Sequence, residues 1–181
     1  TYVDDSSFKL KFLRAHRFDP KAAAVCLVAF FESKRDLFGT QYLTKDITLE
    51  DLDGDDIDLL MRGGYQLLPL RDSSGRLVVS QWPLVQNERD PPMRAKLRSM
   101  FYIIMVALED ESVQKDGIVG LVYNVGHEPN IDRVGIWLGA KLLRSLPIRC
   151  NSLHYCYDND ALRPIISMGM IVVGEQIRAR V

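Results

Sequence analysis

The stretch Gly117–Val125 contains no charged residue, and its apolar side chains fall on both of the sides that alternate along an extended chain. Such a pattern is typical of a strand that is buried on both faces, as in a parallel sheet. Parallel neighbours have to be joined by a crossover connection, which is usually a helix. This segment therefore predicts a sheet with helices packed against it.

The flanking segments supply the other expected elements. Leu77–Trp82 and Ile148–Tyr157 are bounded by turn residues and predict two further strands. Helices are predicted over Met93–Glu109, which follows two prolines, over Ile131–Ser145 and over Ala161–Arg180. The resulting order of strand, helix, strand, helix, strand and helix indicates the α/β class.

The first third of the chain is predicted to be helical. Phe8–Ala15 places apolar residues at i, i+4 and i+7, which is the spacing of one helix face. Asp19 followed by proline predicts a capped helix start, and the helix over Pro20–Phe38 is expected to end at Gly39. A third helix is predicted over Thr48–Arg62.

Composition limits the function. The 23 Lys and Arg residues against 24 Asp and Glu residues give a net charge of −1, which argues against a nucleic-acid partner. The three cysteines form no C-x-x-C pair, so we expect free thiols, a reducing compartment and no metal site. The longest apolar stretches are well short of a membrane span. From the residues we therefore expect a cytoplasmic protein that is soluble or lies on a membrane surface at most; the peripheral membrane association that we also expect is implied by the family resemblance described below.

The motif Asp51-x-Asp53-x-Asp55 resembles the start of a calcium-binding loop. Such a loop needs glycine at its sixth position and a bidentate acid at its twelfth. The chain has Asp56 and Arg62 at those positions. The acidic run is therefore predicted to be an exposed helix edge.

His154 and Cys156 form a candidate catalytic pair, because alternation along a strand puts both side chains on one face. A phosphatase-type loop would also need an arginine six residues after the cysteine, where the chain has Leu162. A buried cysteine in a strand is usually a small apolar filler. We therefore expect no enzymatic activity, and catalysis by this pair is the third and weakest hypothesis.

The predicted last helix lacks a polar face between Pro164 and Gly174. A surface helix normally has one. Two interpretations remain open at this stage. Either the helix is buried between other elements, or its apolar sides face an internal cavity and a membrane.

Several segments resemble the CRAL-TRIO (Sec14-like) family of lipid-binding proteins. Phe12–Ala23 resembles the Leu-Arg-Ala-Arg-x-Phe-Asp-x-x-x-Ala signature of the family's helical N-terminal region. Arg71–Val79 is similar to its Arg-Asp-x-x-Gly-Arg-Pro-Val turn and first sheet strand, and Gly117–Gly126 to its Gly-x-x-x-Ile-x-Asp-x-x-Gly strand. Ser145–His154 is similar to its Tyr-Pro-x-Arg-x-x-x-Ile-His segment. The matches follow in order over nearly the whole chain.

This resemblance implies a helical N-terminal region, expected over residues 1–64, and a CRAL-TRIO α/β domain, expected over residues 65–181 and truncated at its C-terminal end. The α/β domain would be a twisted, mainly parallel sheet flanked by helices, with an apolar cavity and a mobile gate helix at Asp158–Arg178. The implied function is the binding of a phospholipid, phosphoinositide or isoprenoid-type lipid and its transfer between membranes, without a cofactor. We expect a monomer whose partners are this lipid and, transiently, a membrane surface.

The resemblance also assigns candidate site residues. The cavity lining would comprise Val79, Gln81, Leu97, Met100, Phe101, Ile104, Ile118, Val122, Leu138, Leu142, Leu146, Ile148, Cys150 and Leu153. The gate would contribute Leu162, Ile165, Met168, Gly169, Ile171 and Val172. An anionic head group or the membrane would be contacted by Arg149, Arg178 and Arg180. Phosphatidylinositol-binding members carry glutamate where this chain has Ile148.

An alternative function goes with the same fold. Ordinary core packing and a lipid cavity both need apolar side chains, so the composition of the lining does not separate them. A ligand-free module that acts as a protein-interaction scaffold is therefore the alternative to lipid transfer.

Overall fold

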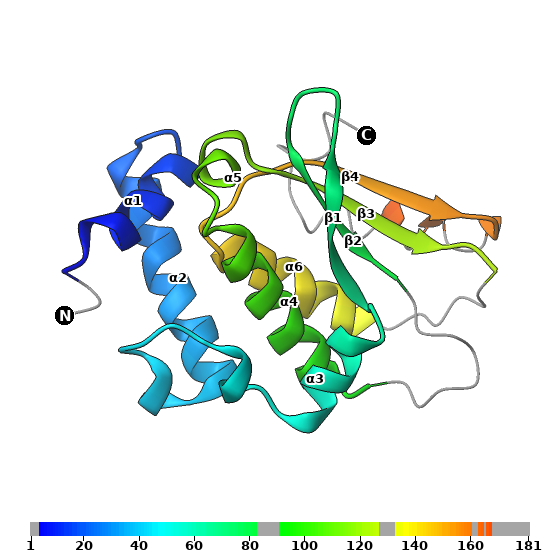
Figure 1. Ribbon diagram of the computed structural model, residues 1–181, viewed down its shortest axis with the longest axis horizontal. Coiled ribbons are helices and arrows are strands. Elements are labelled where there is room, and N and C mark those ends of the chain that lie inside the picture. The colour runs from blue at the N-terminus through cyan, green and yellow to red at the C-terminus, as the bar shows by residue number, and fades with distance from the viewer. Residues whose placement is uncertain (1–3, 83–90, 127–132, 161–162, 165, 168–181) are drawn as a thin grey trace.

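The computed structural model describes residues 4–82, 91–126, 133–160, 163–164 and 166–167 of the 181-residue chain. Helices α4 (Met93–Ala107) and α6 (Arg133–Ser145) lie beside a four-stranded sheet, and α2 (Pro20–Phe38) lies beyond them (Figure 1). The α/β class predicted from the sequence is confirmed.

The sheet has the order β1-β2-β3-β4. β1 (Tyr65–Arg71) runs antiparallel to β2 (Leu77–Gln81), whereas β2, β3 (Ile118–Asn124) and β4 (Cys150–Tyr157) run parallel to one another. The connection from β2 to β3 contains α4, and the connection from β3 to β4 contains α6. The three strands predicted from the sequence are therefore present, with small differences at their ends.

Strand β1 was not expected, because Pro69 interrupts its strand pattern. Proline lacks the N–H of the ladder and is tolerated mainly on edge strands. β1 is an edge strand, and its pairing with β2 is irregular between Leu67 and Arg71. The turn that follows is held by Asp72, whose carboxylate accepts hydrogen bonds of 2.8 Å from the backbone N–H and from the Nε of Arg76.

The first two helices agree with the sequence pattern. α1 covers Ser6–Ala15 and buries its phenylalanine side. Asp19 caps α2 by accepting hydrogen bonds from the backbone N–H groups of Lys21 and Ala22. Gly39, with a φ of 101°, ends the helix in a conformation that favours glycine.

The single helix predicted over Thr48–Arg62 is wrong, because this segment forms two helices. The 3-10 helix η2 covers Leu49–Asp51, and α3 covers Gly54–Met61. The carboxylate of Asp56 accepts a hydrogen bond of 2.8 Å from the backbone N–H of Asp53. This bond caps a new first turn, so the chain starts a second helix instead of continuing the first.

A short helix absent from the sequence prediction, α5 (Glu111–Asp116), follows α4. Asp110 caps it and also pairs with Arg71 of β1, whose Nη2 lies 2.6 Å from the carboxylate. Glu111 pairs with Arg14 of α1 across 2.5 Å. α5 therefore connects the first helix and the β1–β2 hairpin to the end of α4.

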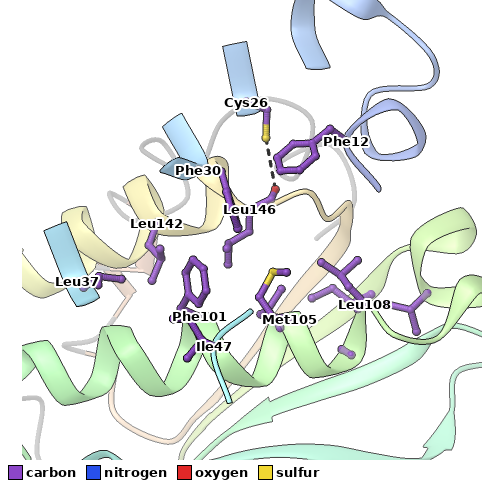
Figure 2. Close-up of a cluster of buried hydrophobic side chains, with 14 of the residues drawn as sticks. Phe12, Cys26, Phe30, Leu37, Ile47, Phe101, Met105, Leu108, Leu142 and Leu146 are labelled. Carbon is purple, nitrogen blue, oxygen red and sulfur yellow. Dashed lines mark hydrogen bonds between the residues drawn. The ribbon is translucent and has the colours of Figure 1, made fainter. Parts of the chain in front are cut away.

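The helices meet in a cluster of aromatic side chains (Figure 2). The ring centroid of Phe30 lies 5.4 Å from those of both Phe12 and Phe101, and Phe38 lies 5.3 Å from Phe101. Edge-to-face and tilted pairs at these separations are favourable beyond the area that they bury. The same hydrophobic cluster includes Val79 of β2. The N-terminal helices and the sheet therefore share one core.

A charged residue is buried beside this cluster. Arg98 of α4 is 6 % exposed, and its Nε lies 3.0 Å from the carboxylate of Asp56. Its guanidinium also donates to Asp53, and its Cζ lies 4.8 Å from the ring centroid of Phe38. Asp56 is 1 % exposed, and this burial raises its pKa against the opposing effects of the Asp53 backbone N–H and Arg98. The expectation of a wholly exposed acidic edge is therefore wrong, because Asp56 is the counter-charge of a buried arginine.

Removing the Arg98 guanidinium would leave Asp56 buried without its counter-charge. Arg98→Met keeps an unbranched side chain, and we expect it to lower the free energy of unfolding by about 3–5 kcal/mol. Urea denaturation followed by circular dichroism measures this change. Arg35→Met is the control, because Arg35 is exposed and pairs only with its neighbour Asp36 among the described residues. A loss no larger than that of the control would contradict the role of the buried pair.

Candidate functional site

One face of the sheet is turned toward α4 and α6. Leu77 of β2 is paired with Ile118 of β3, and Val79 is paired with Gly120. Leu77, Val79 and Ile118 all belong to or pack against the core cluster that the helices share. Because side chains alternate along a strand, every second residue from these positions points to the same side. We call this side the helix-facing side.

A bulge in β4 sets which of its residues reach the helix-facing side. Ile118 is paired with Cys150, but the next residue of β3 is paired with Ser152, so Asn151 is an extra residue in β4. The side-chain amide of Asn151 donates to the backbone carbonyl of Asp116. Because of this extra residue, Cys150 lies on the same side of the sheet as Leu153 and Tyr155, which are three and five positions further along the chain.

Two rows of paired residues therefore cross the helix-facing side from β1 to β4. The row nearer the core, which we call the floor row, consists of Leu67, Val79, Gly120 and Leu153. The next row, which we call the polar row, consists of Tyr65, Gln81, Val122 and Tyr155.

Gly120 leaves the centre of the floor row without a side chain. A Cβ atom built at this position would lie 2.5 Å from Cδ1 of Leu153. The Leu153 side chain therefore leans over the glycine from the neighbouring strand. An alanine at position 120 would require Leu153 to move.

In the central strand β3, burial decreases in the direction of the chain. In β3, the first three residues are buried and the remaining four are half-buried. In β2, Val79 is buried and Gln81 is exposed. The ends of parallel strands that point toward their C-termini are the usual location of ligands in open α/β sheets. The polar row lies at this end.

The floor row and the polar row are electrically neutral, and Arg71, which is paired with Leu77 beyond the floor row, is the charged residue of β1 on this side. The floor and polar rows, together with the described residues that extend them, Asn124 and Tyr157, include no charged side chain. Burial raises the pKa of Tyr65, and burial together with nearby Cys150 raises the pKa of Tyr155. Both phenols therefore keep their protons at neutral pH.

The candidate cavity residues fall into three groups by burial. Six of them are buried in the core cluster: Val79, Phe101, Ile104, Ile118, Leu142 and Leu146. Another four are partly buried and pack against the cluster: Leu97, Met100, Ile148 and Cys150. The remaining positions are the half-buried Val122, Leu138 and Leu153 and the exposed Gln81.

Part of the predicted lining is packed by the protein itself. Phe101 is 1 % exposed and its ring lies against Phe30 and Phe38 of α2. Ile104, one helical turn further on, is 2 % exposed. The part of the predicted lining around Phe101 is therefore occupied by side chains of α2, and Ile104 is buried in the same core cluster. The less buried candidates lie on the sheet, around Val122.

The predicted gate and most of the predicted head-group contacts lie outside the described residues. These are Leu162, Ile165, Met168, Gly169, Ile171, Val172, Arg178 and Arg180. Arg149 is described and half-buried, and its backbone carbonyl accepts a hydrogen bond of 2.8 Å from Ile118. Its Nε is buried and has no hydrogen-bond partner among the described residues. Arg149 precedes β4, so it lies at the opposite end of the sheet from the polar row.

Two residues of the polar row, Tyr65 and Tyr155, were not among the candidates identified from the sequence. Alternation from Leu153 would have identified Tyr155, since the two are separated by one residue. Tyr65 had no such signal, because the strand that carries it was not recognised. The sequence therefore contained the evidence for one tyrosine and not for the other.

The opposite side of the sheet has a different character. Tyr123 stacks on Trp82 with their ring centroids 4.7 Å apart, and Trp82 Nε1 donates a hydrogen bond of 2.8 Å to the Ser80 hydroxyl. His154 and Cys156 also lie on this side, paired with alternate residues of β3, so they share a face as the sequence predicted. His154 is exposed and Cys156 is half-buried.

No family model and no curated protein matches the chain. Within the part of the chain that the structure describes, no helix combines the length and apolar character needed to cross a bilayer. Across the same residues, histidines, cysteines and acids form no group of three or more that could hold a metal ion.

The burial of Cys150 that follows from the bulge can be tested by the reactivity of its thiol. Burial raises the pKa of its thiol to about 11, from a reference value of 9.0. Since only the thiolate reacts, alkylation by iodoacetamide at pH 8 should be about 100-fold slower in the folded chain than in the urea-unfolded chain. The folded rate should rise as the pH approaches 11. Peptide mass spectrometry measures the rate at this cysteine, and equal rates in both states would show that Cys150 faces solvent and that the register of β4 is wrong.

Proposed function

We propose that this chain binds one hydrophobic small molecule on the helix-facing side of its sheet and exchanges it with membranes. The proposed ligand is a phospholipid, a phosphoinositide or an isoprenoid-type lipid. Binding works by burial and involves no bond-making and no cofactor. The proposal places the chain among proteins of the CRAL-TRIO (Sec14-like) type, whose motifs its sequence resembles.

The observation that carries this proposal is the uncharged, half-buried face at the C-terminal end of the strands. Val122 and Leu153 lie on it, and the Leu153 side chain leans over Gly120 at its centre. Covering such a face with an acyl or prenyl chain is favourable, at about 0.8 kcal/mol for each CH₂ group removed from water. A neutral face also avoids the cost of desolvating charged side chains when a hydrocarbon chain is bound.

The positions of the resembling motifs also support the proposal. Phe12–Ala23 spans the end of α1, the turn and the start of α2. Arg71–Val79 spans the last residue of β1, the turn and the start of β2, and Gly117–Gly126 contains β3. Ser145–His154 leads from the end of α6 into β4. Each motif therefore occurs on the kind of element to which the resemblance assigns it.

Exchange with membranes requires a release step. The resemblance assigns this step to a gate at Asp158–Arg178, most of which lies outside the described residues. The composition of Pro164–Gly174, which contains no charged residue, suits a segment that contacts lipid tails. In the proposed mechanism this segment opens at a bilayer, so that the ligand passes between two apolar environments without crossing water.

A second candidate function is a ligand-free protein-interaction scaffold with the same fold. The burial of Phe101 and Ile104 favours it, because side chains of α2 already occupy part of the expected lining. In that case the residues around Val122 would be ordinary, incompletely covered core. The two functions differ in whether this face takes up an apolar molecule.

Two neighbouring residues of β3 provide a matched test. Val122 lies on the helix-facing side and Leu121 on the opposite side, and both are half-buried. We expect the unmodified chain to bind the neutral dye Nile red, with fluorescence enhancement that saturates. Val122→Glu should weaken binding at least about tenfold, because a carboxylate on the binding face must be desolvated. Leu121→Glu should leave the dissociation constant within about twofold.

Circular dichroism of both variants checks that the fold is retained. Saturable binding by the unmodified chain that both variants keep would move the site away from the helix-facing side. Failure of the unmodified chain to bind any apolar probe would contradict lipid binding and favour the scaffold.

A further inference from the structure

We propose that the polar row, Tyr65, Gln81, Val122 and Tyr155, contacts the head group of the ligand and selects an uncharged hydroxyl or carbonyl over a phosphate or another anion. This inference rests on the proposed function and narrows its ligand class. It assigns the hydrocarbon part of the ligand to the floor row and the head group to the next row outward.

The register of the sheet supports this arrangement. Tyr65 is paired with Gln81, Gln81 with Val122, and Val122 with Tyr155, so the four residues form one line across the sheet. Three strand spacings of about 4.8 Å make this line roughly 14 Å wide. A tyrosine stands at each end, on β1 and on β4. The long phenol side chains therefore flank whatever lies on the row.

The hydrogen-bonding groups of the row are unused. Among the residues that the structure describes, none makes a hydrogen bond with the phenol oxygen of Tyr65 or Tyr155 or with the side-chain amide of Gln81. Tyr65 and Tyr155 are half-buried, and a polar group in such a position usually has a partner, because losing its water without replacement is costly. Gln81 is exposed, and its amide remains available between them. A ligand hydroxyl or carbonyl would supply that partner, since a phenol can both donate and accept.

The electrostatics of the face select against an anion. Burial keeps the phenols protonated, and neither row has a cation to pair with a phosphate. The buried arginine of α4, Arg98, is committed to Asp56, and Arg94 donates to the backbone carbonyl of Leu37. An anion on the polar row would therefore lose part of its hydration without gaining a counter-charge from either row, from Arg94 or from Arg98.

The basic residues singled out in the sequence do not change this result. Arg149 lies before the start of β4, whereas Tyr155 lies near its end. Arg178 and Arg180 lie outside the described residues. An anionic head group held by bases elsewhere is the alternative that the following test distinguishes.

The test compares 1-decanol with 1-decanesulfonate, which share a ten-carbon chain and differ in the head group. Isothermal titration calorimetry on the full chain at pH 7 gives both dissociation constants. We expect decanol to bind at least about tenfold more tightly. Because any apolar site favours an alcohol over a sulfonate to some degree, the assignment depends on variants of the row.

The double variant Tyr65→Phe/Tyr155→Phe removes both hydroxyl groups and keeps the rings. We expect it to weaken decanol binding about fivefold or more, while decanesulfonate binding changes less than twofold. Tyr123→Phe is the matched control, because Tyr123 is a half-buried tyrosine on the opposite side of the sheet. It should leave both constants unchanged. The melting temperature of the double variant should not fall, because neither hydroxyl group has a hydrogen-bond partner among the described residues.

Each contrary result has a distinct meaning. Equal or tighter binding of decanesulfonate by the unmodified chain overturns the selection of a neutral head group but leaves the proposed function standing. Preference for decanol that survives in the double variant overturns the assignment to the polar row. Failure to bind either compound overturns the proposed function, and this inference with it.

Discussion

The packing of Phe101 between Phe30 and Phe38 is the contact on which the arrangement of this protein depends. It holds α2 against α4, and α4 in turn carries Arg98, whose buried guanidinium holds α3 through Asp56. The same core cluster extends to the sheet. The side of α4 that faces α2 is therefore used for folding. We therefore place the ligand site on the less buried part of the sheet. Its surface is formed by the ends of the strands and not by the side of α4 that faces α2.

The strand ends meet this requirement because of two local features. The bulge at Asn151 turns Cys150, Leu153 and Tyr155 to the same side, and Gly120, which has no side chain, allows Leu153 to lean over the centre of that side. Together they produce an apolar floor bounded by hydrogen-bonding groups and without charge. Such a combination is unusual for residues that only fill a core, because half-buried phenols usually have hydrogen-bond partners and these two have none among the described residues. It is the physical basis for proposing a ligand that has an apolar chain and a neutral polar end.

Local sequence signals predicted local structure well and long-range contacts poorly. The Asp19 cap and Gly39 predicted both ends of α2, because capping depends on a few adjacent residues. Strand β1 was not predicted because it contains Pro69. A proline is tolerated in a strand mainly at the edge of a sheet, and the sequence alone does not show that β1 is an edge strand. The pair of Arg98 and Asp56 joins residues that are distant in the chain, so no spacing could indicate it. The candidate lining was partly recognised through resemblance and alternation, but which of its members pack against α2 depends on tertiary structure.

The central claim, that the chain holds one hydrophobic molecule, is tested most directly by native mass spectrometry of the purified full-length protein. The account predicts a single adduct of defined mass at a stoichiometry of one per chain. That adduct should disappear on acid denaturation, and it should be recovered in an organic extract as a lipid. A protein that carries no adduct, and that takes none up after incubation with lipid vesicles, would contradict the account and direct attention to protein partners.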